Sequence, residues 1–270
     1  MGWTAGASKR RSSIAAHALL QFTGRGSPLK PEAMRSAALF SLALLFVLPS
    51  VVTPTPAAAK VPVVVELYTA QGCASCGEAN AHVAKLAERP GVLVLTFSVD
   101  YWDYLGWPDT FAKPEFAERQ KAYVARLALR EPYTPQVVVD GAAQAGGSKT
   151  DKVDALVAAA GKGPRNPPDI HFVGERRVYV GSARAPKGGG EVWLIRYDPR
   201  EQDVAVKSGD NKGQTIPHKN VVRELTRLGP WRGKPVAFRL PAASEEGLKS
   251  VVLVQAGRGG RVLGVGEPKA

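Results

Sequence analysis

Long apolar runs alternate with amphipathic segments in the first half of the chain. The run at residues 61–69, VPVVVELYT, is β-branched and almost wholly apolar, which predicts a strand buried on both faces of a sheet. Over residues 76–88 apolar side chains recur at helical spacing, and Arg89-Pro90-Gly91 ends that helix. The run at 92–100, VLVLTFSVD, predicts a second buried strand. The pattern is therefore strand, turn, helix, strand.

This alternation continues as far as residue 160. The segments that follow are a helix over 115–129, a strand over 136–139, a short strand over 142–145 and a helix over 151–160. Ser148 or Thr150 is placed to cap the last helix, because Ser and Thr side chains accept hydrogen bonds from the free N–H groups of a first turn. The order of strands and helices predicts an α/β sandwich.

A linker rich in Gly and Pro, residues 161–168, precedes a different pattern. Short alternating runs follow at residues 170–181, 191–198, 234–240 and 249–256. Their separation by Gly, Pro and Asn turns is typical of an antiparallel sandwich or barrel. We therefore divide the chain into an α/β domain over 60–163 and a β-rich domain over 164–270. The second domain has no cysteine, so we expect it to add specificity rather than chemistry.

Residues 1–59 have the pattern of a leader. The apolar run Ala37–Leu48 follows a basic residue and is too short to span a bilayer, which needs about 20 residues. Ala57-Ala58-Ala59 then completes the order of a secretory signal, with cleavage before Lys60. The alternative is an uncleaved anchor helix. Met34 is a candidate start of translation, and we expect a periplasmic or secreted protein that meets the membrane only through this segment.

Composition narrows the classes of function. With 270 residues and 44% hydrophobic side chains the chain can bury a core, and its two cysteines are too few for a small disulfide-stapled protein. The formal net charge of +12 is spread without a basic run interleaved with aromatic residues, so we expect no nucleic-acid partner. We expect no cofactor and no metal, because a zinc site needs a second cysteine pair or paired histidines and the histidines stand singly.

Cys73 and Cys76 form a Cys-x-x-Cys pair at the start of the first predicted helix. The free N–H groups and the dipole at a helix N-terminus favour an anion, so they lower the pKa of a thiol from about 8.5 to roughly 3.5 to 7.5 in such pairs. Cys73 is the expected nucleophile, and Cys76 the thiol that resolves a mixed disulfide with protein thiols or disulfides. The alternatives are an inert disulfide in a partner-binding module and, last, metal binding.

Four segments resemble one known family. They are VVVELYTAQGCASC, DYWDYLGW, YTPQVVVDG and Asn220-Val221-Val222-Arg223. They are similar to the secreted thioredoxin-like proteins of proteobacteria that are classed as a domain of unknown function. The resemblance implies a thioredoxin-like sandwich followed by the β-rich domain, and export. We expect residues 220–223 to lie where the β-rich domain packs on the thioredoxin-like domain.

The resemblance also implies roles for residues near the cysteines. Thioredoxin-like proteins place a cis-proline opposite the pair, and Thr134-Pro135 matches it; a proline leaves the neighbouring backbone free to pair with a substrate chain. We assign Thr134 and Gly72 to the substrate groove. Glu66 matches a buried carboxylate that takes a proton from the buried thiol, although it lies one position further from the first cysteine than in those relatives.

Aromatic residues gather between the second predicted strand and the second predicted helix. They are Tyr101, Trp102, Tyr104 and Trp107. Such a cluster is either an exposed platform that grips a partner or a part of the core that seats its own segment. The sequence leaves both interpretations open.

Overall fold

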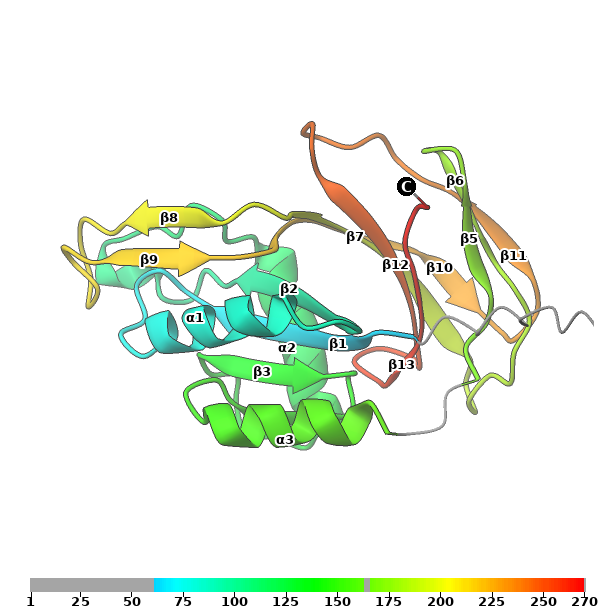
Figure 1. Ribbon diagram of the computed structural model, residues 1–270, viewed down its shortest axis with the longest axis horizontal. Helices are drawn as coiled ribbons and strands as arrows, with labels where there is room; N and C mark the ends of the chain where they lie inside the picture. Colours follow the sequence, from blue (N-terminus) through cyan, green and yellow to red (C-terminus); the bar gives the residue numbers. More distant parts are fainter. Residues whose placement is uncertain (1–60, 163–165, 270) are drawn as a thin grey trace, which may run out of the picture. The chain divides into compact units, whose positions relative to one another are not determined.

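The computed structural model describes residues 61–162 and 166–269. The predicted leader, with Met34 and the cleavage position before Lys60, lies outside the described residues. Within them the chain has a mixed α/β architecture with one eight-stranded mixed sheet, a three-stranded sheet and a two-stranded sheet (Figure 1). None of the helices in this part of the chain is long and apolar enough to cross a membrane.

The first half follows the predicted order of elements. They are β1 (Val63–Thr69), α1 (Cys76–Ala87), β2 (Val92–Ser98), the 3-10 turn η1 (Asp103–Leu105), α2 (Pro114–Arg126), β3 (Gln136–Val139), β4 (Ala143–Gly146) and α3 (Thr150–Ala160). β1 and β2 are parallel, and β3 and β4 extend the sheet antiparallel on the other side of β1. Each predicted strand and helix of this half is confirmed, with shifts of a few residues at the ends.

The predicted cap of α3 is wrong. The N-cap residue is Lys149, which makes no side-chain cap hydrogen bond, and Thr150 is already helical. Ser148 instead donates its hydroxyl hydrogen to the backbone carbonyl of Ser75, at 3.3 Å. The Ser148 side chain therefore ties the loop before α3 to the turn before α1.

The described residues of the second half form strands and connecting segments. The strands are β5 (Ile170–Val173), β6 (Arg177–Val180), β7 (Gly190–Asp198), β8 (Gln202–Ala205), β9 (Thr215–His218), β10 (Val221–Trp231), β11 (Val236–Arg239), β12 (Lys249–Gln255) and β13 (Val262–Gly266). All four predicted runs fall in strands, and the strands pair antiparallel within this half. The pattern does not predict β8, β9 or β10, because polar and charged residues interrupt their apolar positions.

One sheet joins the two halves. Its strand order is β13-β12-β7-β10-β2-β1-β3-β4. β10 and β2 meet in parallel where Val221 pairs with Thr96, and Asn220 donates from Nδ2 to the Val94 carbonyl at 2.9 Å. The prediction that residues 220–223 lie where the two parts pack is confirmed. The described residues of both halves belong to one compact unit, and the domain boundary at residue 163 stays a prediction.

Apolar cores lie on both faces of the joined sheet. One core, which we call the shared core, covers one face across both halves and combines Phe97 of β2 and Phe116 of α2 with Leu253 of β12. Successive strand residues point to opposite faces, so the neighbouring positions build separate cores on the other face. There α1 and α3 pack on the first-half strands, including Leu67, and the three-stranded sheet packs on β7 and β12 around Leu194.

Candidate functional site

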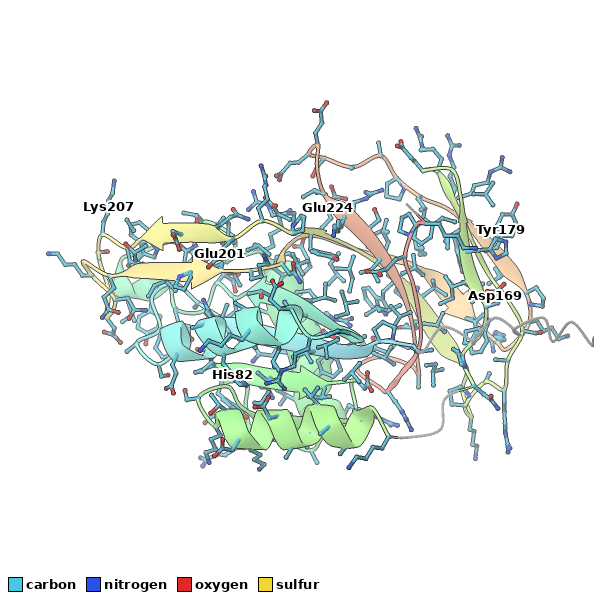
Figure 2. The ribbon with its side chains drawn as sticks, in the orientation of Figure 1. His82, Asp169, Tyr179, Glu201, Lys207 and Glu224 are labelled. Carbon is cyan, nitrogen blue, oxygen red and sulfur yellow. A yellow bond between two sulfur atoms is a disulfide. The ribbon has the colours of Figure 1, made fainter. Side chains whose placement is uncertain are left out.

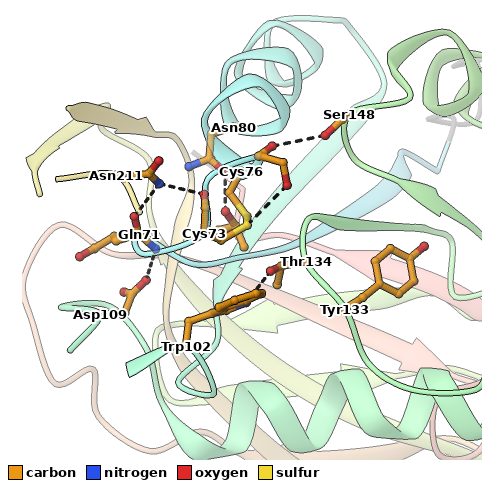
Figure 3. Close-up of a disulfide and its surroundings, with 12 residues drawn as sticks. Gln71, Cys73, Cys76, Asn80, Trp102, Asp109, Tyr133, Thr134, Ser148 and Asn211 are labelled. Atoms are coloured by element: carbon orange, nitrogen blue, oxygen red, sulfur yellow. Dashed lines mark hydrogen bonds between the residues drawn. A yellow bond between two sulfur atoms is a disulfide. The ribbon is translucent and has the colours of Figure 1, made fainter. Parts of the chain in front are cut away.

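The two cysteines form a disulfide at the beginning of α1 (Figure 3). Cys76 is the first helical residue, and Cys73 lies in the preceding turn with its Cα 5.4 Å from that of Cys76. The N–H of Cys76 donates to the Cys73 carbonyl at 3.1 Å, and the N–H of Cys73 donates to the Ala70 carbonyl at 3.2 Å. Cys73 is 3% exposed and Cys76 is fully buried, while Ala74 and Ser75 between them are exposed. The disulfide is thus reached from the solvent only over a short exposed turn.

The Thr134–Pro135 peptide bond is cis, as predicted, and its loop packs close to α1. A Cβ added to Gly147 would lie 2.8 Å from Cβ of Ala79 in α1 and 2.9 Å from Cβ of Pro135. The absence of a side chain at Gly147 therefore allows the proline loop to approach the helix. Trp102 donates from Nε1 to the Thr134 hydroxyl at 2.6 Å. The structure thus places Thr134 and Pro135 beside α1, the helix that begins at Cys76.

Gln71 anchors the cysteine loop to the aromatic segment. Its backbone N–H donates to Asp109 Oδ2 at 2.7 Å, and its side chain donates to the Thr110 hydroxyl at 2.8 Å and accepts from Trp107 Nε1 at 2.9 Å. Burial raises the pKa of Asp109, although hydrogen bonds from the Gln71 and Phe111 backbones favour its charged form. Gly72 is buried beside this anchor. Hydrogen bonds within the first half of the chain therefore hold the loop before Cys73 in place.

The second half reaches the same loop through the turn between β8 and β9. Asn211, fully buried, donates from Nδ2 to the carbonyl oxygens of Gln71 and Cys73, both at 2.8 Å. Nearby, Asn80 of α1 donates from Nδ2 to the Pro217 carbonyl at 3.0 Å. Sequence reasoning missed Asn211, because it follows Cys73 by 138 positions and sits in a polar turn with no motif. Only the fold brings it to the cysteines.

Glu66 lies in a buried hydrogen-bond network. Arg119 of α2 donates to it from Nε at 2.7 Å and from Nη2 at 2.9 Å, Tyr123 donates at 2.6 Å, and Tyr68 donates at 3.0 Å. Burial alone would lower the pKa of Arg119, but the Glu66 carboxylate and the Tyr123 and Tyr68 side chains together outweigh burial, and the pKa is raised. The hydrogen bonds of the Glu66 side chain therefore run to α2 and to its own strand, and the structure does not join it to the disulfide by a hydrogen bond.

The aromatic segment contains both packed and exposed side chains. Tyr101 and Trp102 pack against the shared core, and Trp107 is tied to Gln71. Tyr104 is 78% exposed, and its ring stacks on Trp102 with centroids 6.4 Å apart. One aromatic face beside the cysteine loop is thus open to solvent.

The described residues contain no group of three or more His, Cys, Asp or Glu side chains that could hold a metal ion. His218 is buried, its ring packs edge-on against Phe111 with centroids 5.3 Å apart, and Nδ1 lies 3.0 Å from the Ile216 carbonyl. A carbonyl only accepts, so Nδ1 carries the hydrogen.

Comparison with known proteins places the chain in a family. No curated protein matches it. A protein of known crystal structure from Agrobacterium tumefaciens is 31% identical, and the match covers 78% of this chain and 95% of that protein with a TM-score of 0.63. HBP35 of Porphyromonas gingivalis is 13% identical over 78% of each chain with a TM-score of 0.48, which is too low to argue from. The family model described as "Protein of unknown function (DUF1223)" matches residues 64–255, and the chain belongs to this family.

Proposed function

We propose that this protein is an exported thiol–disulfide oxidoreductase whose first half is a thioredoxin-like domain. The observation that carries the proposal is the Cys73–Cys76 disulfide at the start of α1, with the loop of Thr134 and Pro135 close to the same helix. The order β1-α1-β2-α2-β3-β4-α3, with β1 and β2 parallel and β3 and β4 antiparallel, resembles a thioredoxin fold and supports it.

The proposed exchange uses the two sulfur atoms in sequence. In the reduced protein the Cys73 thiolate attacks a substrate disulfide, which forms a mixed disulfide and releases one substrate sulfur as a thiolate. The Cys76 thiolate then attacks Cys73 Sγ, which restores the internal disulfide and releases the second substrate thiolate. The reverse sequence oxidises a substrate dithiol. Cys73 takes the outer role because Cys76 is fully buried in α1 and Cys73 precedes the helix, where a thiolate is favoured.

Pro135, Thr134 and Gly72 stay proposed groove residues, because the proline loop approaches α1 at Gly147 and Gly72 directly precedes Cys73. The proton-transfer role of Glu66 stays a prediction. The Glu66 carboxylate accepts hydrogen bonds from Arg119, Tyr123 and Tyr68, and Glu66→Gln tests the proton-transfer role directly. A role in proton transfer requires a slower exchange with a changed pH profile in a folded variant.

The oxidoreductase proposal is tested with the two cysteine variants. Cys73→Ser should abolish exchange with a model protein disulfide, and Cys76→Ser should accumulate a mixed disulfide that gel electrophoresis detects without reductant. Ala74→Ser is the matched control, because it places a new hydroxyl between the cysteines while both sulfurs and the contact of the Ser75 hydroxyl with Cys73 Sγ stay in place. If the native protein neither reduces insulin nor oxidises a reduced substrate across a wide range of potentials, the proposal fails.

One observation favours a second candidate, a non-enzymatic partner-binding module with a passive disulfide. Cys73 is only 3% exposed, which is little for an attacking sulfur. Alkylation of the reduced protein as a function of pH separates the two. A fast thiol of low pKa supports the oxidoreductase, and a slow thiol that titrates at about 8.5 supports the binding module.

Export is proposed from residues 1–59 and is tested separately. The pattern ending at Ala57-Ala58-Ala59 predicts a mature protein that begins at Lys60 in the periplasm. N-terminal sequencing of the protein from the periplasmic fraction checks it. A protein that stays in the cytoplasm with its leader intact would contradict export.

A further inference from the structure

The turn between β8 and β9, residues 206–214, packs on the cysteine loop from the second half of the chain. A Cβ added to Gly209 would lie 3.9 Å from the Gly72 Cα and 3.8 Å from Cβ of Leu105. Ser208 donates its hydroxyl hydrogen to the Gly106 carbonyl. The Lys207 side chain of the same turn projects into solvent (Figure 2). The turn therefore has one face on the cysteine loop and another in water.

Asn211 is the polar contact from this turn to the cysteines. Its two Nδ2 hydrogens go to the carbonyls on either side of Gly72, those of Gln71 and Cys73. Its Oδ1 is buried and meets no donor within the described residues, so the donated bonds alone fix the orientation of the amide. The Cys73 carbonyl thus accepts one hydrogen bond from its own turn, at Cys76, and one from Asn211.

We propose that Asn211 is a positioning residue for Cys73 and thereby sets the redox equilibrium of the pair. This inference rests on the proposed function. In the oxidised protein the covalent bond already restrains the loop, so the Asn211 contact adds little order there. In the dithiol the same contact keeps Cys73 near Cys76 and so raises the effective concentration of one sulfur at the other.

The sign of the effect follows from this difference. Loss of the contact releases more conformational freedom in the dithiol than in the disulfide, so it favours the dithiol and raises the reduction potential. We expect the equilibrium constant for disulfide formation against glutathione to fall about tenfold in Asn211→Ala, which is about 30 mV for a two-electron couple.

The experiment measures this constant in the full-length protein with glutathione buffers of defined ratio. Asn211→Leu accompanies Asn211→Ala, because it keeps most of the side-chain volume and removes both donors. Asn80→Ala is the matched control: it removes an amide-to-carbonyl bond between α1 and β9, at Pro217, and the bond from the Thr69 hydroxyl, but no side-chain hydrogen bond to residues 71–76. Lys207→Ala controls for the exposed face of the turn.

We expect a similar fall for both Asn211 variants and a change of less than about twofold for both controls. A constant that stays at the native value in a folded Asn211 variant overturns the proposal, and so does an equal fall in Asn80→Ala, which would indicate general destabilisation. If neither Asn211 variant folds, amide exchange of residues 71–76 in the reduced native protein decides. Protection supports the proposal, and exchange at unfolded rates contradicts it.

This outcome is separable from that of the oxidoreductase proposal. The glutathione equilibrium needs only a reducible disulfide, whereas the insulin assay needs a protein substrate to be turned over. A shifted equilibrium without turnover would leave Asn211 in its positioning role and remove the enzyme assignment. Turnover with an unshifted equilibrium would support the enzyme assignment and remove the positioning role of Asn211.

Discussion

The two halves of the molecule cover one sheet in different ways. In the first half helices lie on both faces of the strands, and in the second half a three-stranded sheet packs on one face. The disulfide sits in the half with helices, where a helix beginning supplies free N–H groups for a thiolate. The other half adds a turn with an amide at the cysteine loop. The comparison teaches that one half holds the disulfide and the other helps to fix the loop around it.

The halves are also tied together inside the shared core. Arg119 of α2 binds Glu66 of β1 and donates from Nη1 to Gln255, the last residue of β12, at 3.3 Å. Its guanidinium also lies over the ring of Trp193 in β7, 5.5 Å from the centroid. One buried cation therefore contacts strands of both halves.

Removal of this cation should have the largest effect. Arg119→Met leaves the Glu66 carboxylate buried without its partner, so we expect a loss of about 3–5 kcal/mol in the free energy of unfolding, measured with urea. The Arg119→Met, Glu66→Met double variant should recover part of the loss. The control is Lys121→Met, which breaks an exposed pair with Glu118 and should leave the stability close to that of the native protein, because exposed ion pairs contribute little. A loss in Arg119→Met no larger than in the control would contradict the role given to the ion pair.

A cavity in the second half tests whether the halves unfold together. Leu194→Ala empties a fully buried position in the core between the three-stranded sheet and the strands β7 and β12, which contains neither cysteine. We expect a loss of about 2–5 kcal/mol in the free energy of unfolding. Because the sheet and the shared core are common, amide protection of α1 should fall with that of β7. Leu86→Ala in α1 is the mirror experiment. If α1 keeps its protection while β7 loses it, the halves are independent units.

Acid should weaken the contact between β9 and the first half through His218. Burial lowers the pKa of this imidazole to about 4. The folded pKa is below the unfolded value of about 6.5, so the unfolded state binds more protons between these limits. His218 therefore removes up to about 3 kcal/mol of stability as pH falls from about 6.5 to about 4, and none above that window.

His218→Asn keeps a donor for the Ile216 carbonyl and does not titrate, so its stability should fall less than that of the native protein over the same range. Urea unfolding at pH 7, 5 and 4 measures the difference between the two proteins. Parallel curves would show that His218 is not responsible.

The smallest effect is expected where β10 meets β2. Asn220 has φ of 52°, a left-handed conformation that Asn and Gly adopt more readily than other residues. Asn220→Gly should lose only the bond to the Val94 carbonyl, about 1 kcal/mol, whereas Asn220→Ala also strains the backbone and should lose about 2 kcal/mol. Thermal unfolding of the two variants side by side checks the order. If the alanine variant is as stable as the glycine variant, the left-handed conformation of residue 220 does not contribute to the loss.

Sequence patterns predicted the parts of the molecule that local order determines. The strand of residues 63–69 and the helix beginning at Cys76 follow from apolar periodicity, whereas the cis bond at Pro135 was implied by the family resemblance. β10 was not predictable in this way. It carries Arg223 and Glu224, and only the pairing with β7 and the ion pair between Glu224 and Arg196 make a strand favourable there.

The candidate site divides in the same way. Cys73 and Cys76 are visible as a spacing, but nothing near them in sequence indicates Asn211 or the anchor between Gln71 and Asp109. For Glu66 the apolar run around it predicts that the carboxylate is buried. The same run does not predict that Arg119 is its partner. A sequence pattern can identify a buried charge, but only the folded structure shows which residue compensates it.

The separation of Cys73 and Asn211 by 138 positions also fixes an order in time. A chain is made from its N-terminus, so both cysteines and all of α1 exist well before the turn that holds Asn211. Until then the Gln71 and Cys73 carbonyls lack the hydrogen bonds from Asn211, and the sulfurs meet whatever oxidants the surroundings hold. The disulfide can therefore close on a half-built protein, and the second half then closes over a bond that is already made.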